Sequence, residues 1–287
     1  MFDEFLNAYY HNDVPPDNSF TKYYATLLRD NHREMFEKND KRNARPLISA
    51  SNLGDPLAVL ILKKLGYKPS ATLPLSPVDR NFLYTGFEVE VRLLAQLMSF
   101  GLNVYGEQQE VEYRGYKGHI DALLDGYVID VKAVKSATFT RMFGKKPYVS
   151  ERYKSQLAFY RAGLGLSHAG LLVYNRDTAD IGFVDLSNDT EAKTELDRKI
   201  DVLESCCSLE YLWENEDTLI PEARPEIYKG AETGNYLLPD EMRFSEYATV
   251  FYHMGTGVNS YGVTKPYVTG YKTFEEAKET LSSWHKS

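Results

Sequence analysis

The stretch GHIDALLDGYVIDVKAVKS, residues 118–136, decides the fold because it places charged side chains inside what otherwise reads as a core β-hairpin. Its second half, residues 128–134, is rich in β-branched residues and predicts a buried strand. Side chains alternate across a strand, so Asp130 and Lys132 point to the same face. Burying these charges is costly unless they pair with each other or bind a cation. The stretch therefore predicts a functional site on a hairpin.

The rest of the composition is that of a globular protein. The chain has 287 residues, enough for one large domain or for a core with appendages, and 43% of them are hydrophobic. Its two cysteines, Cys206 and Cys207, cannot by themselves form a disulfide framework, a zinc finger or an iron–sulfur cluster. The acidic N-terminus lacks the layout of a signal peptide, and the apolar runs are far shorter than the ~20 residues of a membrane span. We therefore expect a soluble, intracellular protein without a membrane partner.

Charge is distributed unevenly along the chain. Thirty-three Lys and Arg against 41 Asp and Glu give a net charge of −8, which excludes a uniformly basic nucleic-acid-binding protein. Residues 131–161 nevertheless hold eight basic side chains against Glu151 alone, so this segment carries +7 and the rest of the chain −15. A local basic surface of this kind attracts a polyanion. A solvated loop and helix face is the alternative, and composition alone leaves both open. The candidate DNA contacts in this segment are Lys135, Arg141, Lys145, Lys146, Arg152 and Lys154.

The order of the expected elements indicates an α/β protein. Helices are expected over most of residues 1–75 and at 81–100, 150–164, 188–205 and from Thr273; strands are expected at 108–113, 117–124, 127–134, 169–174, 180–185, 247–253 and 266–271, with a basic loop after 134. From these elements and the shift in composition after residue 205 we expect three regions. They are a helical N-terminal region (1–75), a core (76–205) and a C-terminal appendage (206–287).

One carboxylate interrupts the apolar stripe of the long helix. Leu83, Phe87, Leu94 and Leu97 recur at helical spacing, and the position that completes the stripe is Glu90. Glu88 belongs instead to the polar face, where an i,i+4 pair with Arg92 is ordinary surface chemistry. Glu90 is therefore the functional candidate on this helix. A position at the edge of the stripe, with the carboxylate reaching solvent, stays open as the alternative.

These side chains combine into a candidate metal site. Glu90, Asp121 and Asp130 supply three carboxylates, and the backbone carbonyl of Val131 supplies a further oxygen. Oxygen ligands of this kind suit Mg²⁺ or Mn²⁺. Lys132 would orient the attacking water and help to deprotonate it. The combination predicts a site for phosphodiester hydrolysis.

Three motifs along the chain resemble a known family. Asp121 followed by Asp130-Val131-Lys132 resembles the hairpin core of the PD-(D/E)XK nuclease superfamily. GFEVE, residues 86–90, is similar to the G-x-x-x-E/H helix of its RecB-like and lambda-exonuclease-like branches. SQLAFYRAGLG, residues 155–165, is similar to their Q-x-x-x-Y helix and adds Gln156 and Tyr160 to the site. The resemblance covers residues 46 to 185.

The resemblance implies both a fold and an activity. The fold would be a restriction-endonuclease-like α/β core, with a mixed central sheet flanked by helices, a helical N-terminal region and a small α+β C-terminal appendage. The activity would be that of a Mg²⁺- or Mn²⁺-dependent deoxyribonuclease, an exonuclease acting in DNA recombination, repair or phage genome processing. It would work in the cytoplasm of a bacterium or of a phage-infected host cell. DNA is the implied partner, together with a homo-oligomeric copy or a phage or host recombination protein.

Two alternatives accompany the resemblance. The chain as a whole could be a non-catalytic nucleic-acid-binding protein that retains the nuclease fold. Gln156 and Tyr160 share a helix face with Tyr153 and could contact a phosphate or the carboxylates, with the two tyrosines available to stack on a base. They could instead belong to a helix packed by Leu157, Tyr160 and Leu164.

The chain also departs from the family's pattern. Ile120 stands where many members have proline before the first aspartate. Many RecB-like relatives hold an iron–sulfur cluster with one cysteine upstream and three downstream of the core. Here Asp55 stands at the upstream position, and residues 238–254 contain no cysteine. We therefore expect no iron–sulfur cluster.

Overall fold

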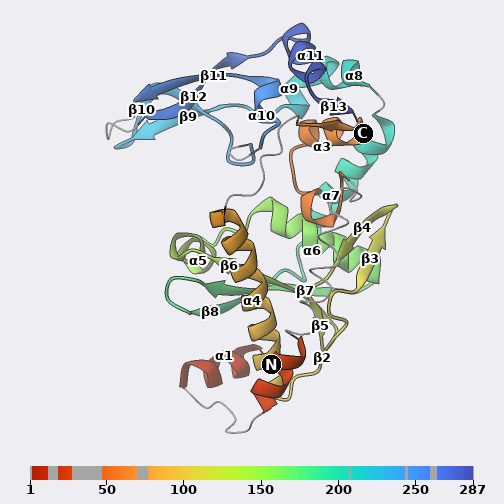
Figure 1. The fold of residues 1–287 in the computed structure, drawn as a ribbon, viewed down its shortest axis with the longest axis vertical. Helices are drawn as coiled ribbons and strands as arrows, with labels where there is room; N and C mark the ends of the chain where they lie inside the picture. Colours follow the sequence, from red (N-terminus) through yellow and green to blue (C-terminus); the bar gives the residue numbers. More distant parts are fainter. Residues whose placement is uncertain are drawn as a thin grey trace. The chain divides into compact units, whose positions relative to one another are not determined.

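The computed structural model is drawn in Figure 1. It describes residues 2–11, 19–27, 47–69, 77–206, 208–242, 245–258 and 264–286. These fall into two compact units, the first made of Met1–Gly54 and Leu73–Asp197 and the second of Asp55–Thr72 and Arg198–Ser287. The units follow other boundaries than the three regions expected from sequence. The reason is that residues 55–72 belong with the C-terminal residues, through the packing of α3 (Leu57–Lys64) on α8 (Leu209–Glu214) and the pairing of β1 (Tyr67–Lys68) with β13 (His285–Lys286).

The first unit is built on a five-stranded mixed sheet in the order β2-β5-β6-β7-β8. Its strands are β2 (Val104–Tyr105), β5 (Ala122–Leu124), β6 (Tyr127–Val134), β7 (His168–Asn175) and β8 (Ile181–Asp185). The central strand β6 pairs antiparallel with β5 and parallel with β7, and β7 pairs antiparallel with β8. The Asp125-Gly126 turn between β5 and β6 has positive φ at both residues, as a two-residue hairpin loop requires.

Helices cover both faces of this sheet. The long helix α4 (Pro77–Ser99) packs its apolar stripe against the face that carries Ile129 and Val131 of β6. Lys132 alternates to the opposite face, where its ammonium approaches the ring of Tyr153 on α6 (Glu151–Leu164). A central mixed sheet flanked by helices confirms the α/β class expected from the sequence.

The hairpin that carries the aspartates differs from the expectation in one place. Residues 117–124 do not form one strand: β4 (Tyr116–His119) pairs with β3 (Glu110–Tyr113) in a separate two-stranded sheet, while β5 belongs to the central sheet. The chain breaks between them at Asp121, whose carboxylate accepts a hydrogen bond from the Val131 amide at 2.7 Å. The side chain thus takes the place of a backbone partner beside β6, which is why the strand ends there.

The basic segment after β6 is not a plain loop. Residues Ser136–Phe143 form helix α5, which places Lys135 at its N-cap and Arg141 in its last turn. The remaining elements of the first unit are α1 (Phe2–His11), a helical segment at residues 19–27, the short 3₁₀ helix η2 (Ala50–Asn52) and the start of α7 (Thr190–Ser205). The helical character expected for the N-terminal region holds for the residues described. The expected break at Pro15-Pro16 lies outside them.

The second unit combines helices with a four-stranded antiparallel sheet in the order β11-β12-β10-β9. The strands are β9 (Arg224–Tyr228), β10 (Ala231–Leu237), β11 (Tyr252–Val258) and β12 (Thr264–Tyr271). The helices of this unit not yet named are α9 (Glu216–Leu219), α10 (Ala248–Phe251) and α11 (Phe274–Ser282). The sequence predicted the β11–β12 hairpin and the final helix but not the β9–β10 hairpin, whose Lys229-Gly230 turn has positive φ at both residues.

Within the part of the chain that the structure describes, no helix combines the length and the apolar character needed to cross a membrane.

Candidate functional site

The site is built around Asp130, which lies in the middle of β6 and is 1% exposed. Its Oδ2 atom forms an ion pair with Lys132 Nζ at 2.6 Å. Among the described residues the other carboxylate oxygen, Oδ1, has no hydrogen-bond partner. A buried carboxylate is normally fully hydrogen-bonded, because the desolvation cost is otherwise uncompensated. Asp130 therefore retains an oxygen, Oδ1, with no partner in this arrangement.

Asp121 lies at the break between β4 and β5, and its carboxylate is directed toward the segment of β6 that contains Asp130. Its Oδ2 atom accepts the Val131 N–H, which points away from β7 toward the β5 edge. The N–H and C=O of one strand residue point to the same edge, so the carbonyl of Val131 is directed toward Asp121 as well. The side chain of Asp121 and the backbone of Val131 thus offer oxygens at one edge of the hairpin.

Helix α4 brings a third carboxylate to the site. Glu88 is exposed, whereas Glu90 is partly buried, as the helical phase predicted. Glu90 Oε1 accepts a hydrogen bond from Gln108 Nε2 at 3.0 Å. The stripe beneath it is buried at Leu94 and Leu97, and the side chain of Leu83 lies outside the described residues.

The charges of these groups act on one another. Burial raises the pKa of Glu90 to about 7, and the charge of Asp130 adds to the rise while the Gln108 hydrogen bond opposes it. Burial, followed by the charges of Glu90 and Asp130, raises the pKa of Asp121 well above its ordinary value. Burial lowers the pKa of Lys132, but the carboxylates of Asp130 and Asp121 outweigh it, so the pKa is raised overall and Lys132 stays an ammonium. Three carboxylates in one confined region thus favour a proton or a cation among them.

The carboxylates do not form a finished metal cage in this arrangement. Among the described residues, no group of three or more His, Cys, Asp or Glu side chains converges closely enough to hold an ion as it stands. Lys132 contacts Asp130 and the Val131 amide contacts Asp121, each taking up one carboxylate oxygen. The oxygen chemistry nevertheless fits a hard divalent ion, because Asp130 keeps a buried oxygen without a partner.

Gln156 and Tyr160 are both buried on α6, at 8% and 2% exposure. Gln156 Nε2 donates to the Tyr160 hydroxyl at 3.2 Å, and that hydroxyl donates to the carbonyl of His119 at 2.5 Å. The pair therefore holds the end of β4, two residues before Asp121, against α6. Stacking of a base on Tyr160 is excluded in this arrangement, because the ring is not accessible.

Gly118 allows this close approach and was not singled out from the sequence. A Cβ atom at Gly118 would overlap the Cβ atom of Ala50 in η2 and lie 2.9 Å from Tyr160 Cε1. A glycine inside a strand often marks such a contact, and that signal was present in the sequence.

The basic residues divide into two groups. Lys135, Arg141, Lys145 and Lys146 are exposed on and after α5, and the guanidinium of Arg141 lies 4.8 Å from the centroid of the Tyr148 ring. They form a basic segment that directly follows β6, the strand that carries Asp130 and Lys132.

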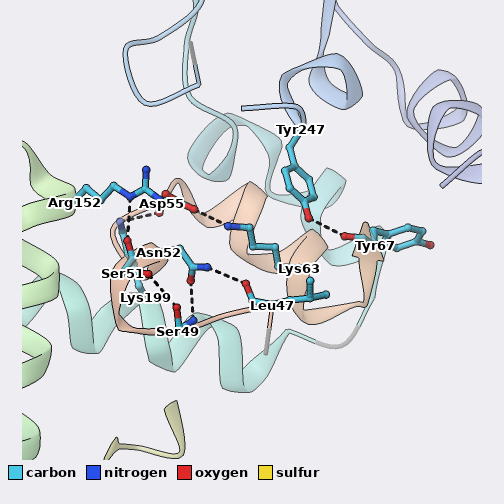
Figure 2. Close-up of polar contacts among 10 residues, drawn as sticks. All are labelled: Leu47, Ser49, Ser51, Asn52, Asp55, Lys63, Tyr67, Arg152, Lys199 and Tyr247. Carbon is cyan, nitrogen blue, oxygen red and sulfur yellow. Dashed lines mark hydrogen bonds and ion pairs between the residues drawn. The ribbon is translucent and has the colours of Figure 1, made fainter. Parts of the chain in front are cut away.

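Arg152 and Lys154, at the start of α6, are engaged within the protein. Arg152 Nε donates to the carbonyl of Ser51 at 3.0 Å, as Figure 2 shows. Lys154 pairs with Glu151 at 2.9 Å, and this hydrogen bond raises the pKa of Lys154. A contact of either side chain with DNA would compete with these partners.

Asp55, which stands where the sequence comparison expected no cluster cysteine, belongs to the second unit. Its carboxylate forms an ion pair with Lys63 at 2.7 Å, and both side chains are mostly buried (Figure 2). In the same unit Tyr247 donates its hydroxyl to the carbonyl of Tyr67 at 2.8 Å. Ordinary polar contacts thus tie residues 55–68 to the C-terminal residues.

Comparison with known proteins gives matches among solved structures. No protein-family model and no curated protein sequence matches the chain. The chain is similar to an alkaline exonuclease from Laribacter hongkongensis, with a TM-score of 0.39 and 17% sequence identity, over 62% of this chain and 97% of the exonuclease. The structure of that exonuclease in complex with dAMP matches with a TM-score of 0.34 and 17% identity, over 59% of this chain and 97% of the exonuclease.

Proposed function

We propose that this protein is a metal-dependent DNA nuclease of the PD-(D/E)XK type. The observation that carries the proposal is the buried carboxylate of Asp130, whose Oδ1 atom lacks a hydrogen-bond partner among the described residues. The charge of this carboxylate interacts with those of Glu90, Asp121 and Lys132. In a structural carboxylate at this depth we expect a hydrogen-bond donor at each buried oxygen. A carboxylate that must receive a cation keeps an oxygen available.

The residues that would hold Mg²⁺ or Mn²⁺ are Glu90, Asp121 and Asp130, with the carbonyl of Val131. A divalent ion bound by them would supply a Lewis acid for the phosphodiester. The chain's own residues supply the rest. The Lys132 ammonium, held by Asp130 at 2.6 Å, is placed to orient the attacking water or a phosphate oxygen by hydrogen bonding. As an ammonium it would act through its charge and its N–H groups.

Gln156 and Tyr160 act in this proposal as positioning residues. Their hydrogen bonds to each other and to the carbonyl of His119 hold β4 against α6, and Asp121 follows two residues later. They would keep the break at Asp121 in place during turnover. This role differs from direct contact with a base or a phosphate.

The finer assignment is an exonuclease that acts on DNA in recombination, repair or phage genome processing, in the cytoplasm. Lys135, Arg141, Lys145 and Lys146 would guide the phosphate backbone toward β6, because a protein with a net charge of −8 must approach DNA through a local positive surface. Arg152 and Lys154 would join them by exchanging their internal partners for phosphate.

The test is cleavage of linear and of circular DNA of the same sequence, with either end labelled, in Mg²⁺, Mn²⁺, Ca²⁺ and chelator. We expect cleavage in Mg²⁺ or Mn²⁺ only, of linear DNA only, and its loss in Asp121→Asn and Asp130→Asn. Glu88→Gln is the matched control, because Glu88 is exposed on the same helix as Glu90. Undiminished cleavage in chelator, or in either aspartate variant, would contradict the metal-dependent nuclease.

The same assay distinguishes the nuclease from the alternative, a non-catalytic DNA-binding protein. That protein would bind the labelled DNA in Ca²⁺ and in Mg²⁺ alike and would leave both substrates intact. Cleavage of circular DNA would keep the nuclease and replace the exonuclease by an endonuclease.

A further inference from the structure

The turn between β2 and β3 places a glutamine at a position with positive φ, where glycine or asparagine is usual. The described non-glycine residues with positive φ are Gln108, Arg114, Asp125, Ala179 and Lys229. Three of these, Arg114, Asp125 and Lys229, precede a glycine in two-residue hairpin loops, where this backbone geometry matches the twist of the strands. Gln108, at φ 56°, is followed by Gln109 and connects strands of two different sheets.

A glutamine in the left-handed region costs of order 1 kcal/mol or more, and such strain persists only where the surroundings impose it. The surroundings of Gln108 are well defined. The Gln109 amide donates to the carbonyl of Gly106 at 3.1 Å, which closes a β-turn with Gln108 at its third position. The Ile120 amide donates to the carbonyl of Gln109 at 3.1 Å. The turn is thus fastened to the residue that directly precedes Asp121.

The strained backbone directs the Gln108 side chain toward α4. Its Nε2 atom donates to Glu90 Oε1 at 3.0 Å, across 18 residues of sequence. A neutral amide fixes the orientation of a carboxylate without neutralising its charge, which a lysine or arginine at the same place would do. The other oxygen of Glu90, Oε2, is left for a different partner.

We propose that Gln108 is the positioning residue for Glu90, holding this carboxylate in the orientation that binds the divalent ion. The inference rests on the proposed nuclease function and adds a residue that the family motifs do not contain. Outer-shell partners of ligating carboxylates fix their geometry, and their loss typically costs 10- to 100-fold in metal affinity or activity.

The deciding variant is Gln108→Gly, because glycine relieves the positive φ while it removes the amide. We expect the dissociation constant of the DNA-free protein for Mn²⁺, measured by isothermal titration calorimetry, to rise about tenfold or more. We also expect the melting temperature without metal to stay the same or to rise. In the cleavage assay kcat should fall at fixed metal concentration while KM for DNA stays unchanged. A residue with a merely structural role would instead lower the melting temperature and leave metal affinity alone.

Two further variants make the comparison specific. Ala179→Gly relieves the positive φ of Ala179, which is 65°, in the turn between β7 and β8, and it should change neither Mn²⁺ affinity nor kcat. Gln108→Asn keeps a residue that tolerates the left-handed region and an amide that is one methylene shorter. It should weaken Mn²⁺ binding as Gln108→Gly does, which excludes a flexible turn as the cause.

The outcomes separate this inference from the function on which it rests. Wild-type Mn²⁺ affinity and kcat in both Gln108 variants, with a wild-type protein that binds Mn²⁺ and cleaves DNA, would overturn the role of Gln108 alone. A wild-type protein whose Mn²⁺ titration is the same as that of Asp130→Asn would overturn the metal site and the positioning role together.

Discussion

Two buried carboxylates in this protein lie on strands of different sheets and are treated in opposite ways. Asp130, on β6 of the first unit, is 1% exposed, and Glu226, on β9 of the second, is 7% exposed. Glu226 accepts hydrogen bonds from Thr233 Oγ1 at 2.9 Å, Asn235 Nδ2 at 3.2 Å and the Tyr267 hydroxyl at 3.2 Å. Asp130 has an ammonium at one oxygen and no hydrogen-bond partner at the other.

The difference separates a structural carboxylate from a candidate catalytic one. The donors of Thr233, Asn235 and Tyr267 reach both oxygens of Glu226 and offset the cost of its desolvation. The desolvation of Asp130 is not offset at its Oδ1 atom, and its charge interacts unfavourably with those of Glu90 and Asp121. Burial alone therefore does not identify a functional acid in this protein. The identity of the donors around the carboxylate does.

The largest expected effect is that of Asp130→Asn. We expect DNA cleavage in Mg²⁺ to fall by about three orders of magnitude or more, because the ion loses a charged ligand. The melting temperature of the metal-free protein should fall, since the amide leaves the buried Lys132 ammonium without its ion-pair partner. Cleavage rates and thermal melts in chelator measure both effects. An active variant would mean that Asp130 is structural like Glu226.

The pH dependence of stability gives the next effect. The pKa of Glu90 is raised by burial to about 7 from an ordinary value of 4.5, so the folded state favours the protonated form. This contribution is fully present below pH 4.5 and is lost as the pH rises through 7, and it amounts to at most about 3 kcal/mol. The metal-free protein should therefore lose stability from pH 5 to pH 8 more steeply than Glu90→Gln.

Chemical denaturation of both proteins across this pH range, in chelator, measures the difference. Mg²⁺ should stabilise the wild type more at pH 8 than at pH 5, because the ion competes with the proton for the carboxylates. If the free energies of unfolding of wild type and Glu90→Gln change with pH in parallel, the carboxylate of Glu90 does not interact with those of Asp121 and Asp130.

Glu226→Ala tests the other side of the comparison. The change leaves the donors Thr233, Asn235 and Tyr267 without their acceptor, and we expect the free energy of unfolding to fall by about 2 kcal/mol. Denaturant titration measures this loss. The loss should be the same with and without Mg²⁺, and Mn²⁺ affinity should not change. A metal-dependent loss of stability would place Glu226 with Asp130 as an ion ligand.

The smallest expected effect concerns exposed lysines of the two units. Lys145→Glu with Lys146→Glu should weaken DNA binding in Ca²⁺ about tenfold at moderate salt and flatten the salt dependence, because each neutralised phosphate contributes about 0.9 to the slope of log K against log salt. The matched control is Lys229→Glu with Lys278→Glu, two exposed lysines of the second unit. The control should leave affinity and slope unchanged. A loss confined to the control would move the DNA track to the second unit.

Much of the central sheet could be predicted from local sequence. The β-branched run of β6, the Asp125-Gly126 turn and the phase that buries Glu90 and exposes Glu88 are all readable over a few residues. Their readability has a simple cause, since strand alternation and helical periodicity are properties of neighbouring residues. The helix α5 was missed because its eight residues are too short a window for periodicity to stand out, although Phe139, Met142 and Phe143 fall at helical spacing.

The sequence by itself determined the class of fold and the residues that could form a site: an α/β core whose central hairpin carries two aspartates and a lysine. The tertiary structure decided how these side chains are used. It ended the strand at Asp121 by an amide from β6, buried Tyr160 behind Gly118, and gave Glu90 a partner in Gln108. It also gave Glu226 three donors and left Asp130 with an oxygen that has none. Each of these facts depends on atoms brought together from distant parts of the chain, and the hydrogen-bond partners of a buried group are not encoded by its neighbours in sequence.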